Sequence, residues 1–208
     1  LGLDRLDAQL LLSHTLQQPR AWLIAHDEAA LTAAQRQTFA EASRRRADGE
    51  PMAYLLGERE FHGLMLQVGP AVLVPRPDTE TLVDWALELL AGTAATDVAD
   101  LGTGSGAIAL ALKHRHPSAR VCAVDLSAAA LELAQANARR LELELEFVQG
   151  DWWRPLRGRR FHLAVSNPPY ISNGDHHLSA LTHEPQTALA SGPDGLDDIR
   201  SIIAQVAD

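Results

Sequence analysis

The chain has 208 residues, of which 46% are hydrophobic and 22% are charged, as is ordinary for a globular protein in water. No apolar run approaches the roughly 20 residues needed to span a bilayer, so we expect no membrane protein. The formal net charge of -9 disfavours broad binding to a phosphate backbone, which depends on clustered Lys and Arg residues. We therefore expect no binding to DNA.

The cysteine content and the first residues indicate where the protein works. The single cysteine, Cys122, cannot form an internal disulfide and lies in an apolar stretch, where it should be a small buried hydrophobe. The start of the chain shows no basic segment followed by an apolar run and a cleavage site. We expect a cytoplasmic protein, and a monomer with one full core and a small accessory unit.

The first 57 residues are predicted to be helical. Leucines recur at helical spacing over residues 3–10. Residues 32–35, Thr-Ala-Ala-Gln, have the form of a capping box and open a helix that should run to the basic residues 44–46 and end near Gly49. Most such basic runs are a solvated helix face, although contact with an acidic partner or ribosomal RNA stays open. We predict an N-terminal helical domain over residues 1–57.

Beyond Gly57 the apolar residues alternate with polar ones, which is typical of strands. They stand at positions 64, 66 and 68 before Gly69-Pro70 and at 72 and 74 after it. This pattern predicts a β-hairpin that turns at Gly69-Pro70 and links two domains over residues 58–76. Pro77-Asp78 then opens a helix with a buried apolar side, so the second domain is predicted over residues 77–208.

The second domain alternates predicted strands with predicted helices. Strands are expected over residues 97–101, 120–125, 143–148 and 161–166, with helices that begin at Gly106 and after Ser127. Such a βαβ succession implies an α/β fold with a parallel, Rossmann-like sheet and helices on both of its faces. The third strand alternates leucine and glutamate, unlike the other three, and should lie at the edge of a sheet with strand order 3-2-1-4.

A glycine-rich turn joins the first of these strands to its helix. Gly102, Gly104 and Ala107 also satisfy the dinucleotide fingerprint, with Asp125 at the expected distance of about 20 residues. A carboxylate at Asp100 and a third glycine at Gly106 favour a sulfonium cofactor instead, because a carboxylate attracts a cation and repels a pyrophosphate. We predict binding of S-adenosylmethionine, with S-adenosylhomocysteine as product, by Asp100, Gly102, Thr103, Gly104, Ser105 and Gly106.

Acidic residues also follow the second and third predicted strands. Asp125 ends the second strand, where a carboxylate can accept hydrogen bonds from both hydroxyls of a ribose. A helix cap is the alternative role, but Ser127 already fills it. Asp151 follows the third strand and could bind an adenine amino group while Trp152 covers the ring. A turn Asp and a packed Trp explain these two residues equally well.

Residues 167–170 read Asn-Pro-Pro-Tyr and end the fourth predicted strand. Consecutive prolines stiffen the segment and remove two N–H donors, so its carbonyls are free to accept hydrogen bonds. Such a site suits a planar amide or amino nitrogen, whose N–H groups Asn167 and the Pro168 carbonyl would hold while Tyr170 stacks on the planar group. A strand-ending turn is the alternative. We predict Asn167, Pro168 and Tyr170 as catalytic, and Asn167, Pro168, Pro169 and Tyr170 as substrate-binding.

Together with residues 51–58 and 74–80, these motifs resemble the protein-(glutamine-N5) methyltransferases that modify peptide chain release factors, the HemK/PrmC family. The resemblance spans nearly the whole chain and implies a class I methyltransferase sheet with an N-terminal domain that docks the substrate. It implies methyl transfer to the glutamine of the Gly-Gly-Gln loop in class I release factors. It also implies that residues 102–106, Asp125, Trp152 and Asn167 bind S-adenosylmethionine.

The sequence departs from this family in two places, and other functions stay open. His183 stands where an aromatic residue is common, and the chain stops at Asp208 inside an expected helix, so we expect further residues beyond it. One alternative is a nucleic-acid amino methyltransferase, which would need a basic groove, and another is a non-catalytic adaptor that senses the cofactor. His176 and His177 lack the spacing of a metal site, so no metal is expected.

Overall fold

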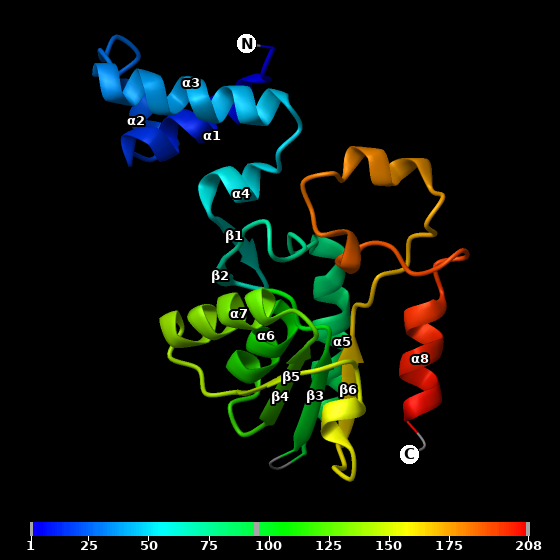
Figure 1. Cartoon of the computed structure of the whole chain (residues 1–208). Helices are drawn as coiled ribbons and strands as arrows, with labels where there is room; N and C mark the ends of the chain where they lie inside the picture. The colour runs from blue at the N-terminus through cyan, green and yellow to red at the C-terminus, as the bar shows by residue number, and fades with distance from the viewer. Residues whose placement is uncertain (1, 94–95, 207–208) are drawn as a thin grey trace. The chain divides into compact units, whose positions relative to one another are not determined.

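The structure is a computed structural model, and it describes residues 2–93 and 96–206 (Figure 1). Residues 1–57 and residues 58–208 form two compact units. The outer limits predicted for the two domains, Leu1 and Asp208, lie outside the described residues. Within the described ranges, the helices lack the combination of length and apolar character that crossing a bilayer demands.

Helices make up the first unit. They are α1 (Arg5–Leu16), α2 (Arg20–Ala25), α3 (Ala33–Ala47) and α4 (Met52–Leu56). The Thr32 side chain accepts a hydrogen bond from the Gln35 backbone N–H at 3.2 Å, and the Gln35 side chain accepts one from the Thr32 backbone N–H at 2.9 Å. The predicted capping box is therefore confirmed, as is the helical character of this part of the chain.

The basic run at residues 44–46 is tied into its own unit. Each arginine pairs with an acidic side chain: Arg44 with Glu41, Arg45 with Glu50 and Arg46 with Asp7. The Arg46–Asp7 pair, at 2.6 Å between Nε and Oδ2, joins the end of α3 to α1. Such partly exposed pairs stabilise a fold only modestly. Their effect here is to neutralise the run, which favours its interpretation as a helix face.

A two-stranded hairpin opens the second unit, but its turn is not where the alternation predicted it. β1 (Glu58–Phe61) pairs antiparallel with β2 (Leu64–Gln67), so the prediction of a hairpin that turns at Gly69-Pro70 is wrong. A turn does form at residues 69–72, where the Val72 N–H donates to the Gly69 carbonyl at 3.1 Å, but it joins no paired strands. The connecting residues, His62 and Gly63, have φ angles of 50° and 82°. A type I′ turn needs a positive φ at both central residues and matches the twist of the two strands. His62-Gly63 therefore makes the hairpin turn that was predicted for Gly69-Pro70.

Residues 68–76 follow the hairpin as an irregular segment. Val68, Val72 and Val74 are buried, although this segment belongs to neither sheet of the described chain. The alternation in the sequence therefore comes from the burial of these three valines around the turn at residues 69–72 and not from paired strands.

The rest of the second unit is an α/β domain. Its strands are β3 (Asp97–Leu101), β4 (Arg120–Asp125), β5 (Glu146–Gln149) and β6 (Leu163–Ser166). Its helices are α5 (Glu80–Leu90), α6 (Ala107–Arg115), α7 (Ala128–Arg140) and α8 (Asp197–Gln205), with 3-10 turns η1 (Pro77–Thr79), η2 (Arg154–Leu156), η3 (His176–Ala180) and η4 (Gln186–Ala188). β3 and β4 have the predicted bounds. β5 begins at Glu146 rather than at 143, and β6 at Leu163 rather than at 161.

The four strands form a parallel sheet in the order β5-β4-β3-β6 (Figure 1). This confirms the predicted strand order and the edge position of the third predicted strand. One face of the sheet packs against α5, α6 and the hairpin around Val98 and Val121. The opposite face packs Leu101 and Val124 against η2 and Trp152. The two inner strands are thus buried on both faces, as their continuous apolar sequences require.

One buried amide joins the hairpin to the α/β domain. Asn137 of α7 is fully buried and donates to the Gln67 carbonyl at 3.0 Å and to the Ser105 carbonyl at 2.9 Å. Its oxygen accepts from the Gln67 backbone N–H at 2.7 Å. A buried amide is tolerated when its hydrogen bonds are made, and these three connect β2, α7 and the glycine-rich turn.

We predict that Asn137→Ala lowers the free energy of unfolding by about 2 to 4 kcal/mol, because it strands the buried backbone groups of two segments. Urea denaturation followed by circular dichroism measures this loss. Glu132→Ala, at an exposed position of the same helix, is the control and should change stability by less than about 0.5 kcal/mol. Equal losses in the two variants would show that the amide network adds nothing.

Candidate active site

The carboxyl ends of β3, β4 and β6 meet at one edge of the sheet. The ladders end at Leu101, which lies opposite the last residue of β6 and the last but one of β4. The next residues along the three strands are Gly102, Asp125 and Asn167. The register alone therefore brings the three predicted motifs together, at the edge where open α/β sheets bind ligands.

The glycine turn, residues 102–106, is held against β4. The backbone N–H groups of Gly102 and Thr103 both donate to the Val124 carbonyl at 2.9 Å. Gly102 has a φ of 74°, and a Cβ added there would lie 3.0 Å from the Trp152 ring. Glycine is required at this position both by the backbone conformation and by the close approach of the ring.

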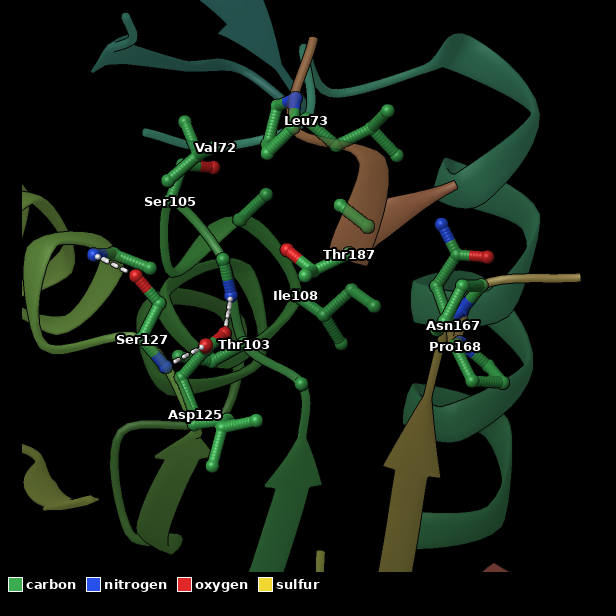
Figure 2. A pocket seen from close by; sticks show the side chains of 18 of the residues that line it. Val72, Leu73, Thr103, Ser105, Ile108, Asp125, Ser127, Asn167, Pro168 and Thr187 are labelled. Atoms are coloured by element: carbon green, nitrogen blue, oxygen red, sulfur yellow. Dashed lines mark hydrogen bonds between the residues drawn. The ribbon is translucent and has the colours of Figure 1, made fainter. Parts of the chain in front are cut away.

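Asp125 uses both carboxylate oxygens to hold backbone N–H groups (Figure 2). One oxygen accepts from Gly104 at 2.8 Å and the other from Ser127 at 2.9 Å. Burial raises the pKa of Asp125, and these hydrogen bonds act in the opposite direction. The Ser127 hydroxyl accepts from the Ala130 N–H at 3.2 Å, which confirms the predicted helix cap. A carboxylate has about four acceptor sites, so Asp125 keeps capacity for ligand hydroxyls.

Asp100 lies behind the glycine turn and is fully buried. Its Oδ2 accepts from the Thr103 hydroxyl at 2.7 Å and from the Ala109 backbone N–H at 3.2 Å, whereas Oδ1 has no hydrogen-bond partner. Burial raises the pKa of Asp100 to about 7. The carboxyl group thus ties the turn to α6. Direct contact with a cofactor stays a prediction for this residue.

A cavity of about 480 Å³ lies where the strand ends meet, a volume within the range of small-molecule sites. The predicted site residues that line it are Gly102, Thr103, Gly104, Ser105, Asp125, Asp151, Trp152, Asn167, Pro168 and Pro169. Asp100, Gly106 and Tyr170 do not line it. The residues expected to hold cofactor and those expected to hold acceptor therefore share one space.

The acceptor tip lies across the cavity from the glycine turn. Figure 2 shows Asn167 and Pro168 on the side opposite Asp125, with Ile108 and Thr187 between them. The Asn167 side-chain amide donates to the Thr79 hydroxyl at 3.5 Å.

Tyr170, which follows this tip, is 63% exposed and points to no partner ring among the described aromatic contacts. Its predicted stacking on the acceptor stays a prediction.

Sequence reasoning missed two segments that complete the wall. They contribute Val72, Leu73, Pro75 and Arg76 from the irregular segment, and Pro185, Thr187 and Ala188 from the region around η4. Neither segment follows a strand of the main sheet, so the rule about strand ends could not find them. The only signal was the resemblance of residues 74–80 to a segment of a known family, and it covers only the first of the two wall segments.

The charges around the cavity favour a cationic ligand. Three aspartates line it, at positions 125, 151 and 198, and the single lining arginine among the described residues is Arg76. Arg76 pairs with Glu184 at 2.5 Å, and Asp151 pairs with Arg154 at 2.9 Å. A pyrophosphate needs uncompensated donors or positive charge. A sulfonium or ammonium group matches this acidic lining better.

The histidines of η3 lie near one acidic side chain. Asp175, His176 and His177 have potential ligand atoms within 4.8 Å of one another. The Asp175 carboxylate accepts from the His177 backbone N–H at 2.8 Å and lies 2.8 Å from its ring nitrogen Nδ1. These contacts account for the cluster as a local turn, because Asp commonly bonds the backbone two residues ahead.

A parallel sheet in this strand order, with a glycine turn after β3 and a carboxylate after β4, is the fold of a class I methyltransferase. The chain is similar to the hMettl16 catalytic domain in complex with MAT2A 3'UTR hairpin 6, with a TM-score of 0.55 and 16% identity over 85% of this chain and 63% of that one. It is also similar to a T. thermophilus 16S rRNA methyltransferase in complex with AdoMet and guanosine, with a TM-score of 0.50 and 26% identity over 56% and 33%.

Sequence comparison gives the family. The profile described as Methyltransferase small domain matches residues 79–192, and that described as PrmC N-terminal domain matches residues 1–57. The release factor glutamine methyltransferase of Coxiella burnetii is 48% identical over 96% of this chain and 72% of its own length. That of Bordetella pertussis is 50% identical over 94% and 73%. The chain belongs to the release factor glutamine methyltransferase family.

Asp100 gives a prediction about pH. The folded state holds its proton more tightly than the unfolded chain, because burial raises the pKa from 3.8 to about 7. Its contribution to stability is therefore full below about pH 4 and is lost as pH rises to 7, by roughly 1.4 kcal/mol per pH unit between the two values. Asp100→Asn keeps an oxygen for Thr103 and Ala109 but carries no charge.

The difference in unfolding free energy between Asp100→Asn and the wild type should therefore move in favour of the variant between pH 5 and pH 7. Urea titrations at both values measure it, and the titration of all other groups cancels in the difference. Parallel stability curves for the two proteins would contradict a neutral Asp100 in the fold.

Proposed function

We propose that this chain transfers a methyl group from S-adenosylmethionine to the side-chain amide nitrogen of the glutamine in the Gly-Gly-Gln loop of class I release factors. The observation that carries the proposal is the single cavity that Asp125 and Asn167 line from opposite sides. A donor and an acceptor that bind these two sides would face each other without further movement. Family membership supports the choice of substrate.

The residues on the glycine side fit the cofactor. Asp125 would accept hydrogen bonds from the ribose hydroxyls through the acceptor sites left by its two backbone contacts. Trp152 and Asp151 would contact the adenine ring and its amino group. The excess of aspartates in the lining matches the positive charge of the donor. When bound, S-adenosylmethionine supplies an electrophilic methyl group.

The residues on the opposite side fit an amide. An amide nitrogen is a poor nucleophile because its lone pair is delocalised into the carbonyl group. Asn167 and the Pro168 carbonyl would accept hydrogen bonds from its two N–H groups and return electron density to nitrogen. As the N–CH3 bond forms, the S–CH3 bond breaks and S-adenosylhomocysteine leaves, and the methylated amide, then a strong acid, gives its extra proton to water. Pro168 and Pro169 have fixed φ angles, so the backbone that carries the Pro168 carbonyl is stiff before substrate arrives. The rate then comes from positioning and not from a strong base.

The first unit would contribute to binding of the protein substrate. Residues 1–57 match the PrmC N-terminal domain, and we propose that they dock the release factor beside the catalytic domain. We expect a monomer that acts in the cytoplasm, where translation takes place.

Asn167→Ala should lower kcat for release-factor methylation by about 100-fold or more while S-adenosylmethionine affinity changes by less than about threefold. The lost contacts act on the acceptor, and most cofactor contacts stay in place. Kinetics with a purified release factor and isothermal titration calorimetry with cofactor measure the two quantities. Asn173→Ala, at an exposed position of the next loop, is the control and should match the wild type.

The choice of substrate has its own test. The protein is incubated with methyl-labelled S-adenosylmethionine and either a class I release factor, the same factor with its loop glutamine replaced, or duplex DNA. We expect label in the intact release factor alone. Label in DNA, or in the factor without its glutamine, would overturn the proposed substrate.

A further inference from the structure

Glu184 is a buried carboxylate that the proposed chemistry does not use. Its side chain is 3% exposed. Oε2 accepts from the Val74 backbone N–H at 3.0 Å, and Oε1 accepts from Arg76 Nη2 at 2.5 Å. These contacts join parts of the chain that are 108 and 110 residues apart in sequence. We call the three groups the Glu184 clamp.

The clamp fastens the two wall segments that no strand of the main sheet positions. Residues 72–76 form one segment and residues 185–188 the other, and both contribute side chains to the cavity, whereas Glu184 itself does not. The glycine turn and the acceptor tip directly follow Leu101 and Ser166, which the ladders of the main sheet hold in place. The irregular segment is held instead by the hydrogen bond that the Val74 backbone N–H donates to Glu184.

The clamp also leads to the acceptor tip. Arg76 directly precedes η1, which ends at Thr79, and the Thr79 hydroxyl accepts from the Asn167 amide at 3.5 Å. That hydrogen bond occupies the NH2 end of the Asn167 side chain. It thereby turns the oxygen end, which the acceptor needs, away from Thr79. A shift of residues 74–79 would move the group that orients Asn167.

A charged group suits this task because its contacts are costly to break. Removing a carboxylate from water is expensive, and the cost is offset only while its partners stay in place. Any motion that separates Glu184 from Arg76 or from Val74 leaves a buried charge without compensation. A neutral contact in the same place would allow more displacement for the same energy.

We propose that Glu184 and Arg76 are positioning residues that set the orientation of Asn167 through residues 74–79, and so govern methyl transfer more than cofactor binding. The inference rests on the proposed function, because its effect is measured on release-factor methylation. The pair touches neither reacting atom. Its role is to hold one wall of the cavity at the distance that the acceptor requires.

The test compares the full chain with Glu184→Gln, Arg76→Gln and the double variant. Each is assayed for kcat with saturating release factor, for S-adenosylmethionine affinity by calorimetry, and for melting temperature, with kinetics run well below the lowest melting point. Glu184→Asp keeps the charge but has a side chain that is shorter by one methylene. This variant is used for the test if the neutral variants fail to fold. The control is Arg120→Gln, which breaks a surface pair with Asp97 at the opposite end of the sheet.

We expect each clamp variant to lower kcat at least tenfold with less than a threefold change in cofactor affinity. The loss of kcat in the double variant should be no larger than the loss in the more impaired of the two single variants, because the pair acts as a unit. Arg120→Gln should keep the wild-type kcat. Clamp variants, Glu184→Asp included, that keep the wild-type kcat would overturn the proposal, and so would equal losses in kcat and cofactor affinity. An inactive wild type would instead count against the proposed function.

Discussion

Parallel pairing of β3 with both β4 and β6 is the constraint on which the rest of this structure depends. Parallel strands end at the same edge of a sheet, so three loops far apart in sequence converge there. The register then decides which residues meet. With Leu101 opposite Val124 and Ser166, the positions that follow are Gly102, Asp125 and Asn167. No contact among these side chains is needed to bring them together, because the backbone ladders do so.

Buried polar groups complete what the ladders begin. Asp125 and Asp100 hold the glycine turn through backbone N–H groups and a hydroxyl, Asn137 fastens the hairpin, and Glu184 fastens the irregular segment. Each such group is costly to bury and therefore tolerates little displacement of its partners. Much of the cavity wall is thus made of loop residues that these contacts hold to the rest of the domain. A methyltransferase that relies on geometry, and not on a strong base, has use for such rigidity.

Much of this arrangement could be predicted from the sequence. The features that could not be predicted were missed for physical reasons. The bounds of β3 and β4, the sheet order and the cap at Ser127 follow from local patterns that the structure confirms. The hairpin was predicted in the wrong place because Val68, Val72 and Val74 are buried on either side of a turn whose flanks do not pair, and their spacing in the sequence resembles that of strand residues. The wall made by residues 72–76 and its contact with Glu184 join positions 110 residues apart, and no periodicity or motif rule reports such a contact.

The most direct test of the account is a structure of the protein with S-adenosylhomocysteine and a peptide that contains Gly-Gly-Gln. The account predicts ribose hydroxyls on Asp125, the glutamine amide within hydrogen-bond reach of the Asn167 oxygen and the Pro168 carbonyl, and the sulfur between them in the cavity. The account would be contradicted if the adenosine of S-adenosylhomocysteine lay against Asn167, or if the glutamine side chain lay outside the cavity.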